Sequence, residues 1–320
     1  MNTPKLKSSF IVKKIITFSL LVCKLFLIFF FLKFPRDVLF ASRDGLMLWF
    51  NNVLPALLPF IVIINLLTSM GVVRTISAWA SPIMKYVFKL PGAGGFAFIT
   101  GIISGYPMGA KAIGDLWRSK EITTKEAQRL LTFCNNAGPL FIVGVVGVGL
   151  LGNQTAGYAL WMGHVAAAII MGLMTRGRGE QSRRNDSLRV IMHDMPNIGK
   201  VLGDAVKNAM DALVVVGGLI IFFAVVTRAV VMLVGDIPYI GVLAGMIEIT
   251  GGVKMLSEGV VTPVSLGLIG GVIAFGGFSV HAQALHFTAG TGVKAGQYVL
   301  YKLANGIIAG AITWLLWSAT

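Results

Sequence analysis

A charge-free stretch rich in glycine and proline constrains the fold of this chain more than any other feature. Residues 90–110 read LPGAGGFAFITGIISGYPMGA, with six glycines, two prolines and no Asp, Glu, Lys or Arg. A second such stretch, at 259–293, contains GGFSVHAQALHF, and both lie between more ordinary apolar segments. Lipid cannot satisfy free backbone N–H and C=O groups, so broken backbone at membrane depth needs a covering of protein or a watery cavity. Two such segments in corresponding places are typical of the centre of a transporter.

The composition indicates a membrane protein built from helices. Of the 320 residues, 56% are hydrophobic and 12% are charged, whereas a soluble domain carries about 25% charged residues. Long apolar runs recur along the chain, and a helix of about 20 apolar residues crosses a bilayer. We therefore expect an all-α polytopic membrane protein that has the lipid bilayer as a partner.

The net charge of +14 does not indicate a nucleic-acid partner. The Lys and Arg residues lie in short segments between apolar runs, where membrane topology places them. The two cysteines, Cys23 and Cys134, lie in apolar segments without a CxxC pair, so neither a disulfide framework nor a zinc site is expected. We expect no cofactor and no metal site.

Charge and hydropathy divide the chain into four parts. Residues 1–45 hold a basic N-terminal segment and a first membrane helix, which we expect to be retained because no small-residue cleavage site follows it. Residues 46–175 and 208–320 form two apolar repeats. Residues 176–207 form a basic loop with seven Lys or Arg residues against four Asp or Glu.

The first repeat carries its own start and stop signals for helices. Thr123 and Glu126 match a capping box, which predicts a helix start at Thr124. The following run at 130–175 has no formal charge over 46 residues. That length predicts two spans, divided near 152–154.

The distribution of Lys and Arg predicts an orientation in the membrane. With the N-terminus inside and both broken segments folded as re-entrant hairpins, 19 cations lie on the inner side and 6 on the outer side, Lys294 and Lys302 among the latter. Cytoplasmic loops carry the excess of Lys and Arg. We therefore expect a multi-pass protein of the cell membrane whose N-terminus and 176–207 loop are cytoplasmic.

The two halves of the chain resemble each other. Each runs as a span, a shorter segment, a broken hairpin and a helix with the pattern KxxQxxLxxxxN. Lys125, Gln128, Leu131 and Asn136 recur as Lys294, Gln297, Leu300 and Asn305 at an offset of 169, and Ser104 matches Ser279 at an offset of 175. By the charge count, the halves enter the membrane from opposite sides. We therefore predict two inverted repeats, the arrangement of many secondary transporters.

The first candidate binding site is the break within residues 90–110. Glycines let a ligand or another backbone come close, and a proline breaks the helix and frees a carbonyl. Such freed groups, beside Ser, Tyr and Lys side chains, would bind an ion or a polar solute. Tight packing through small residues is the alternative, because Gly105 and Gly109 have GxxxG spacing. The candidate residues are Ser104, Gly105, Tyr106, Pro107, Gly109 and Lys111.

Two adjacent amides, Asn135 and Asn136, are the second candidate. They lie in a long apolar run, and polar groups at membrane depth are costly unless they are paired. They would either bind a solute or cap the neighbouring broken hairpin. Asn305, the counterpart of Asn136 in the second half, is expected to support the same site.

Glu248 is the candidate for ion coupling. A carboxylate within a membrane segment is a functional candidate by default. Together with the neighbouring Thr250, it would bind a coupling Na⁺ or carry a coupling H⁺. A simple ion pair with Lys254 or Arg228 is the alternative.

The second hairpin tip is expected at Ser279-Val280-His281-Ala282-Gln283. Ser279, His281 and Gln283 are its candidate binding residues, and His281 would either titrate or hydrogen-bond a ligand. A structural hydrogen bond from His281 is the alternative. The chain has no HExxH, P-loop, GxSxG or dinucleotide fingerprint, so we do not expect an enzyme.

The broken segments and their neighbours resemble the sporulation integral membrane proteins of the YlbJ type, within the broader group that has a nucleoside-recognition Gate domain. The resemblance covers nearly the whole chain after residue 35. It is carried by LPALLPF (54–60), LPGAGGFAFITGIISGYPMGAK (90–111), EAQRLLTFCNNAG (126–138), GNQTAGYAL (152–160), EITGG (248–252) and GFSVHAQ (277–283). It implies opposed hairpins and an inverted repeat, similar to concentrative nucleoside transporters, and a link to spore cortex formation.

Two hypotheses of function follow. The first is a secondary carrier of a polar solute, coupled to H⁺ or Na⁺, with the solute between the tips at 104–111 and 279–283. The second is a non-transporting scaffold for a sporulation assembly, which predicts no polar cavity and a partner-binding surface on 176–207. Glycine-rich faces would also permit a homo-oligomer.

Overall fold

The computed structural model describes residues 21–22, 24–69, 72–177, 198–235 and 237–320, and this part of the chain is helical without a β-strand. The expected all-α fold is confirmed. The basic N-terminal residues 1–20 and most of the 176–207 loop lie outside the described residues. The elements after a helix that includes residues 24–33 are α2 (Pro35–Leu48), η1 (Trp49–Val53), α3 (Leu54–Ser69), α4 (Val72–Pro82), η2 (Ile83–Phe88), α5 (Gly94–Ile103), α6 (Met108–Arg118), α7 (Thr124–Cys134), η3 (Leu140–Leu150), α8 (Gln154–Met174), α9 (Ile198–Val234), α10 (Ile240–Ile247), α11 (Ile249–Leu256), α12 (Pro263–Phe275), α13 (Gly277–Phe287) and α14 (Ala295–Ser318), where η denotes a π-helix.

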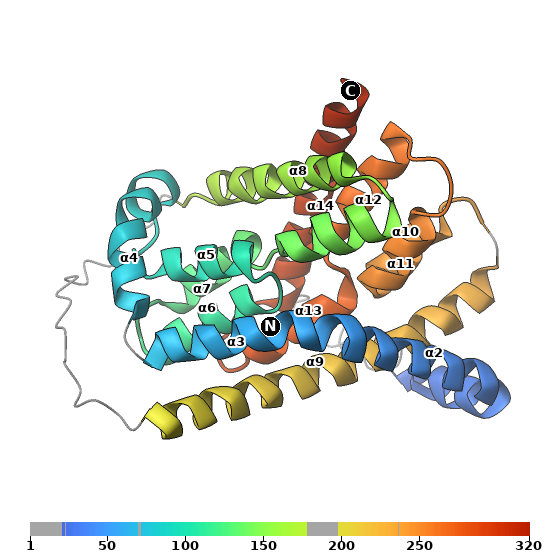
Figure 1. Ribbon diagram of the computed structural model, residues 1–320, viewed down its shortest axis with the longest axis horizontal. Coiled ribbons are helices and arrows are strands. Elements are labelled where there is room, and N and C mark those ends of the chain that lie inside the picture. Colours follow the sequence, from blue (N-terminus) through green and yellow to red (C-terminus); the bar gives the residue numbers. More distant parts are fainter. Residues whose placement is uncertain (1–20, 23, 70–71, 178–197, 236) are drawn as a thin grey trace, which may run out of the picture.

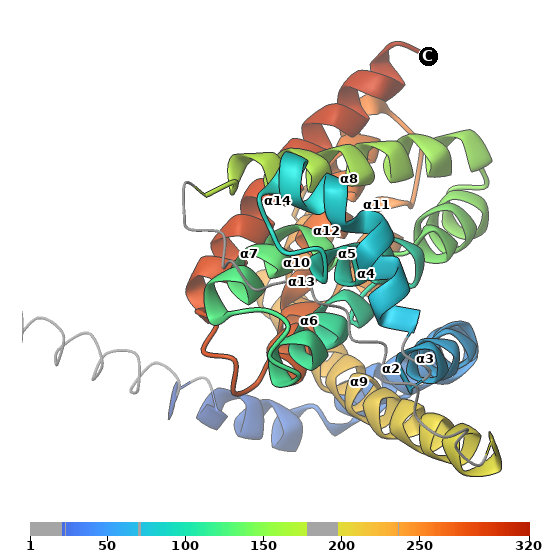
Figure 2. The same cartoon turned by 90° about the vertical axis from the view of Figure 1, so that its left-hand side faces the viewer.

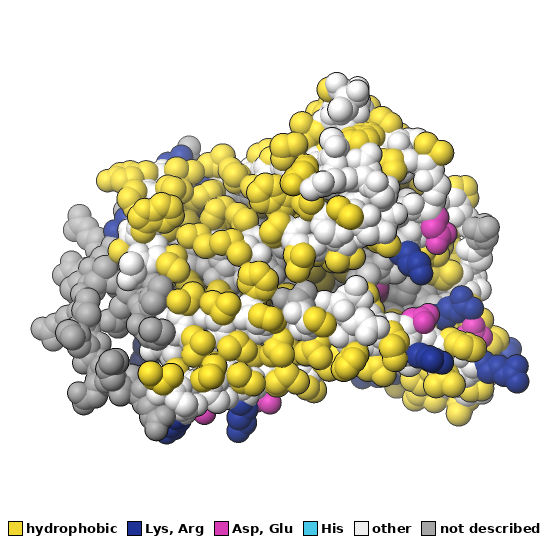
Figure 3. All heavy atoms as spheres, viewed as in Figure 1, with side chains coloured by type: hydrophobic (Ala, Val, Ile, Leu, Met, Phe, Trp, Pro, Cys, Tyr) yellow, Lys and Arg dark blue, Asp and Glu magenta, His cyan; other side chains and the backbone are white. Residues whose placement is uncertain are grey.

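Four helices of the described chain are long and apolar enough to cross a membrane: α8, α9, the pair α12–α13 at Pro263–Phe287, and α14. The pair Pro35–Val53 and Leu57–Leu67, bent by 54°, makes a fifth if it forms one span. Hydrophobic side chains cover most of the face in Figure 3, and the charged side chains lie mainly towards its margins. The chain is therefore a multi-pass membrane protein.

Helices α2, α3 and α9 lie together along one side of the molecule (Figures 1 and 2). The Trp49 indole donates a hydrogen bond to the Leu213 carbonyl at 3.0 Å. Farther along, the Arg228 guanidinium pairs with Asp37 at 2.7 Å. Helix α9 begins at Ile198, so the last ten residues of the expected 176–207 loop belong to a long helix.

The first glycine-rich segment folds back on itself as expected. Helices α5 and α6 pack against each other, and the chain reverses between them at residues 104–107. Helix α7 then begins at Thr124, where Thr123 and Glu126 form the expected capping box. After α7 the backbone is irregular from 135 to 138, and the helix that resumes at Pro139 continues as η3, which is followed by α8.

The second fold-back does not lie where the sequence pattern placed it. Helices α10 and α11 pack against each other on either side of Glu248, whereas Pro263–Phe287 forms a single candidate span. The prediction of a hairpin tip at 279–283 is therefore wrong. Gly276 and Gly277 have φ values of 91° and 71°, which glycine adopts without steric cost, and they interrupt the helix without reversing it.

The order hairpin, broken helix, long helix therefore occurs twice. It runs as α5–α6, α7–η3 and α8, and again as α10–α11, α12–α13 and α14. This order pairs α14 with α8, whereas the KxxQxxLxxxxN pattern pairs it with α7, so the two registers differ. In each case the hairpin tip touches the break of the helix that follows. A Cβ on Gly105 would lie 2.5 Å from the Gly138 amide nitrogen, and one on Gly277 would lie 2.8 Å from the Gly245 carbonyl oxygen.

Arg129 on α7 forms hydrogen bonds with the ends of two other helices. Its guanidinium donates to the carbonyls of Phe88 at 2.6 Å, Lys89 at 3.0 Å and Thr175 at 2.9 Å, and these are groups that helix ends leave without intrahelical partners.

Replacing Arg129 by glutamine should destabilise the fold by about 2 kcal/mol, because hydrogen bonds from a charged donor to these carbonyls are lost. The measurement is thermal unfolding of the purified protein in detergent. Lys125→Gln, at an exposed position on the same helix, is the control and should leave the melting temperature unchanged. An equal effect of the two substitutions would contradict the role given to Arg129.

Candidate functional site

A cavity of about 120 Å³ lies where the two halves meet. Its walls come from the end of α2, η1, α3, the α5–α6 tip, the α7–η3 break, η3, α9, the α10–α11 tip and α13. The polar side chains that line it are Asn52, Ser104, Tyr106, Glu248, Thr250, Ser279 and Gln283. The sequence had singled out all of these except Asn52.

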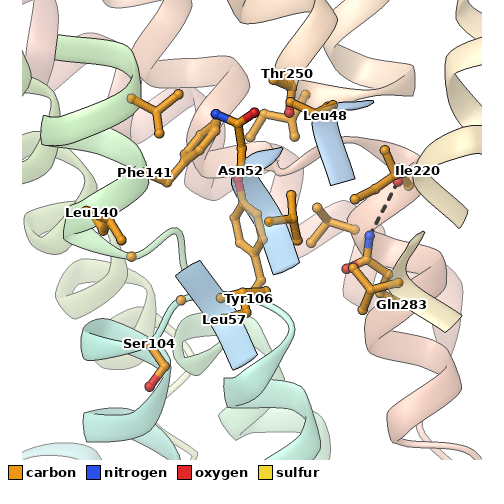
Figure 4. Close-up of a pocket in the computed structure, with 18 of the residues that line it drawn as sticks. Leu48, Asn52, Leu57, Ser104, Tyr106, Leu140, Phe141, Ile220, Thr250 and Gln283 are labelled. Atoms are coloured by element: carbon orange, nitrogen blue, oxygen red, sulfur yellow. Dashed lines mark hydrogen bonds between the residues drawn. The ribbon is translucent and has the colours of Figure 1, made fainter. Parts of the chain in front are cut away.

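Tyr106 extends from the first tip into the middle of this cavity, towards Asn52 and Phe141 (Figure 4). Its ring lies 6.5 Å from the ring of Phe141, centroid to centroid. Its hydroxyl is buried and has no hydrogen-bond partner among the described residues. Ser104 lines the same cavity, but its hydroxyl points away from the Tyr106 ring (Figure 4). Tyr106 is therefore the group at this tip that a bound solute would meet.

Glu248 is buried at the second tip, with 4% of its surface exposed. Its carboxylate is the N-cap of α11 and accepts hydrogen bonds from the amides of Thr250 at 3.0 Å and Gly251 at 2.7 Å. An acidic group at a helix N-terminus is stabilised by the free amides and by the helix dipole. No described Lys or Arg forms an ion pair with Glu248, and Arg228 pairs with Asp37 instead.

Ser279 and Gln283 reach the cavity from successive turns of α13. They are 1% and 3% exposed, and the Gln283 amide approaches the Ser279 hydroxyl at 3.4 Å (Figure 4). Among the residues that line the cavity, Glu248 alone is Asp, Glu, Lys or Arg. The site is therefore formally negative, and the rest of its polar surface is neutral.

The two adjacent asparagines lie behind the cavity and hold the α7 break. The Asn135 amide donates to the Tyr298 hydroxyl at 2.8 Å, and the Asn136 amide donates to the Phe133 carbonyl at 2.7 Å. The backbone amide of Ala137 donates to the His164 ring nitrogen Nε2 at 3.0 Å. Neither asparagine is among the lining residues, so the capping alternative fits their geometry.

The break between α12 and α13 is held in a similar way. The His281 ring nitrogen Nε2 lies 2.8 Å from the Phe275 carbonyl. Asn305, on α14, donates from its side-chain nitrogen to the Ala167 carbonyl at 3.2 Å, and its side-chain oxygen accepts from Lys302 Nζ at 3.3 Å. Both side chains are buried and neither lines the cavity, so they are placed to support the backbone rather than to touch a solute.

The remaining candidates of the first tip, Pro107, Gly109 and Lys111, do not line the cavity. Lys111 binds Asp115 at 2.9 Å and Asn65 at 3.3 Å. Gly109 faces the carbonyl group of Cys134 so closely that a side chain there would overlap it. Pro107 immediately precedes α6. Of the tip residues, Ser104, Gly105 and Tyr106 line the cavity.

Lys302 is the main polar residue that the sequence reading misplaced. It was counted as an outer-side cation, yet it is 1% exposed within α14. Its position three residues before Asn305, inside the helix predicted from the KxxQxxLxxxxN pattern, was the signal available.

Two comparisons with known proteins give matches to this chain. The family model Gate, described as nucleoside recognition, matches residues 50–154. The sporulation integral membrane protein YlbJ of Bacillus subtilis (strain 168) is 33% identical over 325 aligned residues, which cover 88% of this chain and 78% of that protein. The chain belongs to the YlbJ family. No solved structure matches it.

The family match and the cavity overlap only in part. The Gate match in this YlbJ-family chain runs from η1 to the first residue of α8, and so includes the first hairpin and the α7 break. Glu248, Ser279 and Gln283 lie outside it. The cavity therefore combines side chains of the Gate region with side chains of the second half.

Proposed function

We propose that this YlbJ-family protein is a secondary carrier of a small polar solute. The observation that carries the proposal is the cavity at the meeting point of two broken hairpins, which holds Tyr106 from one tip and Glu248 from the other. Ligand sites in carriers lie where discontinuous helices from two repeats converge near the middle of the bilayer. The scaffold hypothesis predicts no polar cavity, so the cavity favours the carrier.

We also infer that the two halves are inverted repeats, similar to those of concentrative nucleoside transporters. The repeated order of hairpin, broken helix and long helix supports this inference. So does the matching contact of each tip with the next break, Gly105 at Gly138 and Gly277 at Gly245. Movement of one repeat against the other would then expose the cavity to each side of the membrane in turn.

The charge of the cavity points to a class of solute. Among the described residues, Glu248 is the one acidic residue of its lining and no Lys or Arg lines it, so the site offers no positive charge to an anion, and an unpaired charge at membrane depth is costly. We therefore propose a neutral or cationic solute with hydrogen-bonding groups and an apolar part that packs against Tyr106 and Phe141. Nucleosides satisfy this description. We also propose a role in spore formation, which the name of the relative in Bacillus subtilis supports.

The experiment that tests the carrier is uptake into proteoliposomes. Purified full-length protein would be screened with nucleosides, amino acids, amines and small carboxylates, with and without imposed H⁺ and Na⁺ gradients. Saturable uptake of a neutral or cationic compound supports the proposal. Uptake restricted to anions would contradict the solute class, and no uptake of any compound by folded protein would favour the scaffold.

Replacing Tyr106 by phenylalanine should weaken transport while leaving stability unchanged. The lost hydroxyl has no hydrogen-bond partner in the part of the chain that the structure describes, so the substitution removes a contact that the solute makes. One such hydrogen bond is worth about 1 kcal/mol, and we expect the KM for uptake to rise about fivefold to tenfold.

The matched control is Tyr298→Phe. Tyr298 is bound to Asn135 and lies outside the cavity lining. This variant should lose stability by about 1 kcal/mol with little change in KM. The assignment of Tyr106 fails if the two variants show the reverse pattern.

A further inference from the structure

Lys302 carries a buried amine that the carrier site does not use. Its side chain is 1% exposed, and its Nζ donates a hydrogen bond to the backbone carbonyl of Asn135 at 3.0 Å. No described carboxylate forms an ion pair with Lys302. A buried ammonium without a counter-ion is costly, so the groups around it must compensate for its charge.

The end of α7 compensates for the positive charge of the Lys302 ammonium. Helix α7 ends at Cys134, and the chain is irregular at 135–138. The last carbonyl groups of a helix have no intrahelical partners and form the negative end of its dipole. In carriers with broken helices, such ends and the unwound carbonyls beside them bind the coupling cation. The Lys302 ammonium therefore lies at a position suited to a cation.

A second neutral oxygen lies beside the amine. The side-chain oxygen of Asn305 accepts a hydrogen bond from Lys302 Nζ at 3.3 Å, and its side-chain nitrogen donates to the Ala167 carbonyl at 3.2 Å. Asn305 is 0% exposed. With the Asn135 carbonyl that Lys302 also binds, this position presents neutral oxygens of the kind that bind hard cations.

We propose that the ammonium of Lys302 takes the place of a sodium ion at the end of α7. The Lys302 amine then occupies the oxygens that Na⁺ would need, so no Na⁺ binds there while the side chain is intact. One consequence rests on the proposed carrier function. A Na⁺ gradient does not drive transport by Na⁺ binding at the α7 break. Coupling would instead involve Glu248 at the second tip.

The test is a sodium-dependent melting experiment on the full-length protein in detergent. Every sample carries Glu248→Gln, which removes the other buried charged group that could attract Na⁺. Melting is compared in sodium chloride and in choline chloride at equal ionic strength. The variants are Lys302→Ala, Lys302→Arg and the control Lys294→Ala, which removes an exposed lysine at the N-cap of the same helix.

The expected result is a new response to sodium where the ammonium is removed. Lys302→Ala should melt at least about 3 °C higher in sodium than in choline, because Na⁺ then stabilises the folded state by binding to it. The protein with Lys302 intact, Lys302→Arg and Lys294→Ala should melt at the same temperature in both salts.

Two outcomes would overturn the proposal. One is sodium-specific stabilisation with Lys302 intact, because Na⁺ would then bind beside the amine. The other is a Lys302→Ala variant that gains nothing from sodium, whether it melts equally in both salts or fails to fold in either. Because melting is measured rather than flux, these outcomes are distinct from a failure of the carrier proposal, which only the uptake screen decides.

Discussion

Glu248→Gln is expected to abolish gradient-driven uptake in proteoliposomes while the protein still folds. Glutamine has nearly the shape of glutamate and keeps one oxygen to accept from the amide of Thr250 or Gly251, so the loss at the N-cap should be limited to about 1 kcal/mol. The lost charge matters more, because Glu248 is the single Asp, Glu, Lys or Arg residue that lines the cavity.

The reason lies in the geometry of the carboxylate. Two backbone amides at 3.0 Å and 2.7 Å hold its oxygens at the start of α11. The carboxyl group can release a proton and then attract a coupling cation or a cationic solute, whereas the glutamine amide can do neither. We expect the rate of coupled uptake to fall by at least about 100-fold, which corresponds to about 2.7 kcal/mol.

The measurement is initial uptake of the solute identified by the screen, with and without an imposed ion gradient. Glu248→Asp retains both charge and N-capping ability and should keep part of the coupled uptake. Glu258→Gln removes an exposed carboxylate just after α11 and should have no effect. Coupled uptake that is unchanged in Glu248→Gln would remove Glu248 from the mechanism.

The sequence predicted local features well wherever a short-range rule decides them. The start of α7 at Thr124 follows from a capping box, whose two hydrogen bonds involve residues three apart. The break at Ser104–Pro107 follows from glycine and proline in a charge-free run. That Ser104, Tyr106, Glu248, Ser279 and Gln283 meet at one cavity follows from a weaker rule, which is that polar groups in an apolar chain gather where protein covers them.

The placement of the second hairpin shows the limit of such rules. Glycine pairs occur at 251–252 and at 276–277, and composition alone does not tell a reversal from an interruption. The reversal at Glu248 depends on Gly245 and Gly252, which let α10 and α11 touch along their backbones. That contact is tertiary. The burial of Lys302 is also tertiary, because the partner that accepts its hydrogen bond is 167 residues away.

Gly101→Ala should have the largest effect on stability of the substitutions considered for this chain. Gly101 on α5 and Gly109 on α6 face the carbonyl group of Cys134 at the end of α7, and a Cβ on either would overlap that oxygen. A backbone carbonyl cannot rotate away as a side chain can, so the hairpin must separate from α7. Overpacking of this kind costs about 1–3 kcal/mol when side chains can adjust, and we expect at least the upper end.

Thermal unfolding in detergent provides the measurement, and Gly218→Ala provides the control. Gly218 is also helical, on α9, and beyond its own stretch of helix no described heavy atom lies within 4 Å of the position its Cβ would take. Alanine is the better helix former by about 1 kcal/mol, so this variant should be neutral or slightly stabilised. Gly101→Ala should instead melt lower by roughly 6–12 °C. Because the same contact fixes the tip that carries Tyr106, any Gly101→Ala protein that folds should also have lost uptake. A Gly101→Ala protein as stable and active as Gly218→Ala would mean that the first hairpin does not pack against the end of α7.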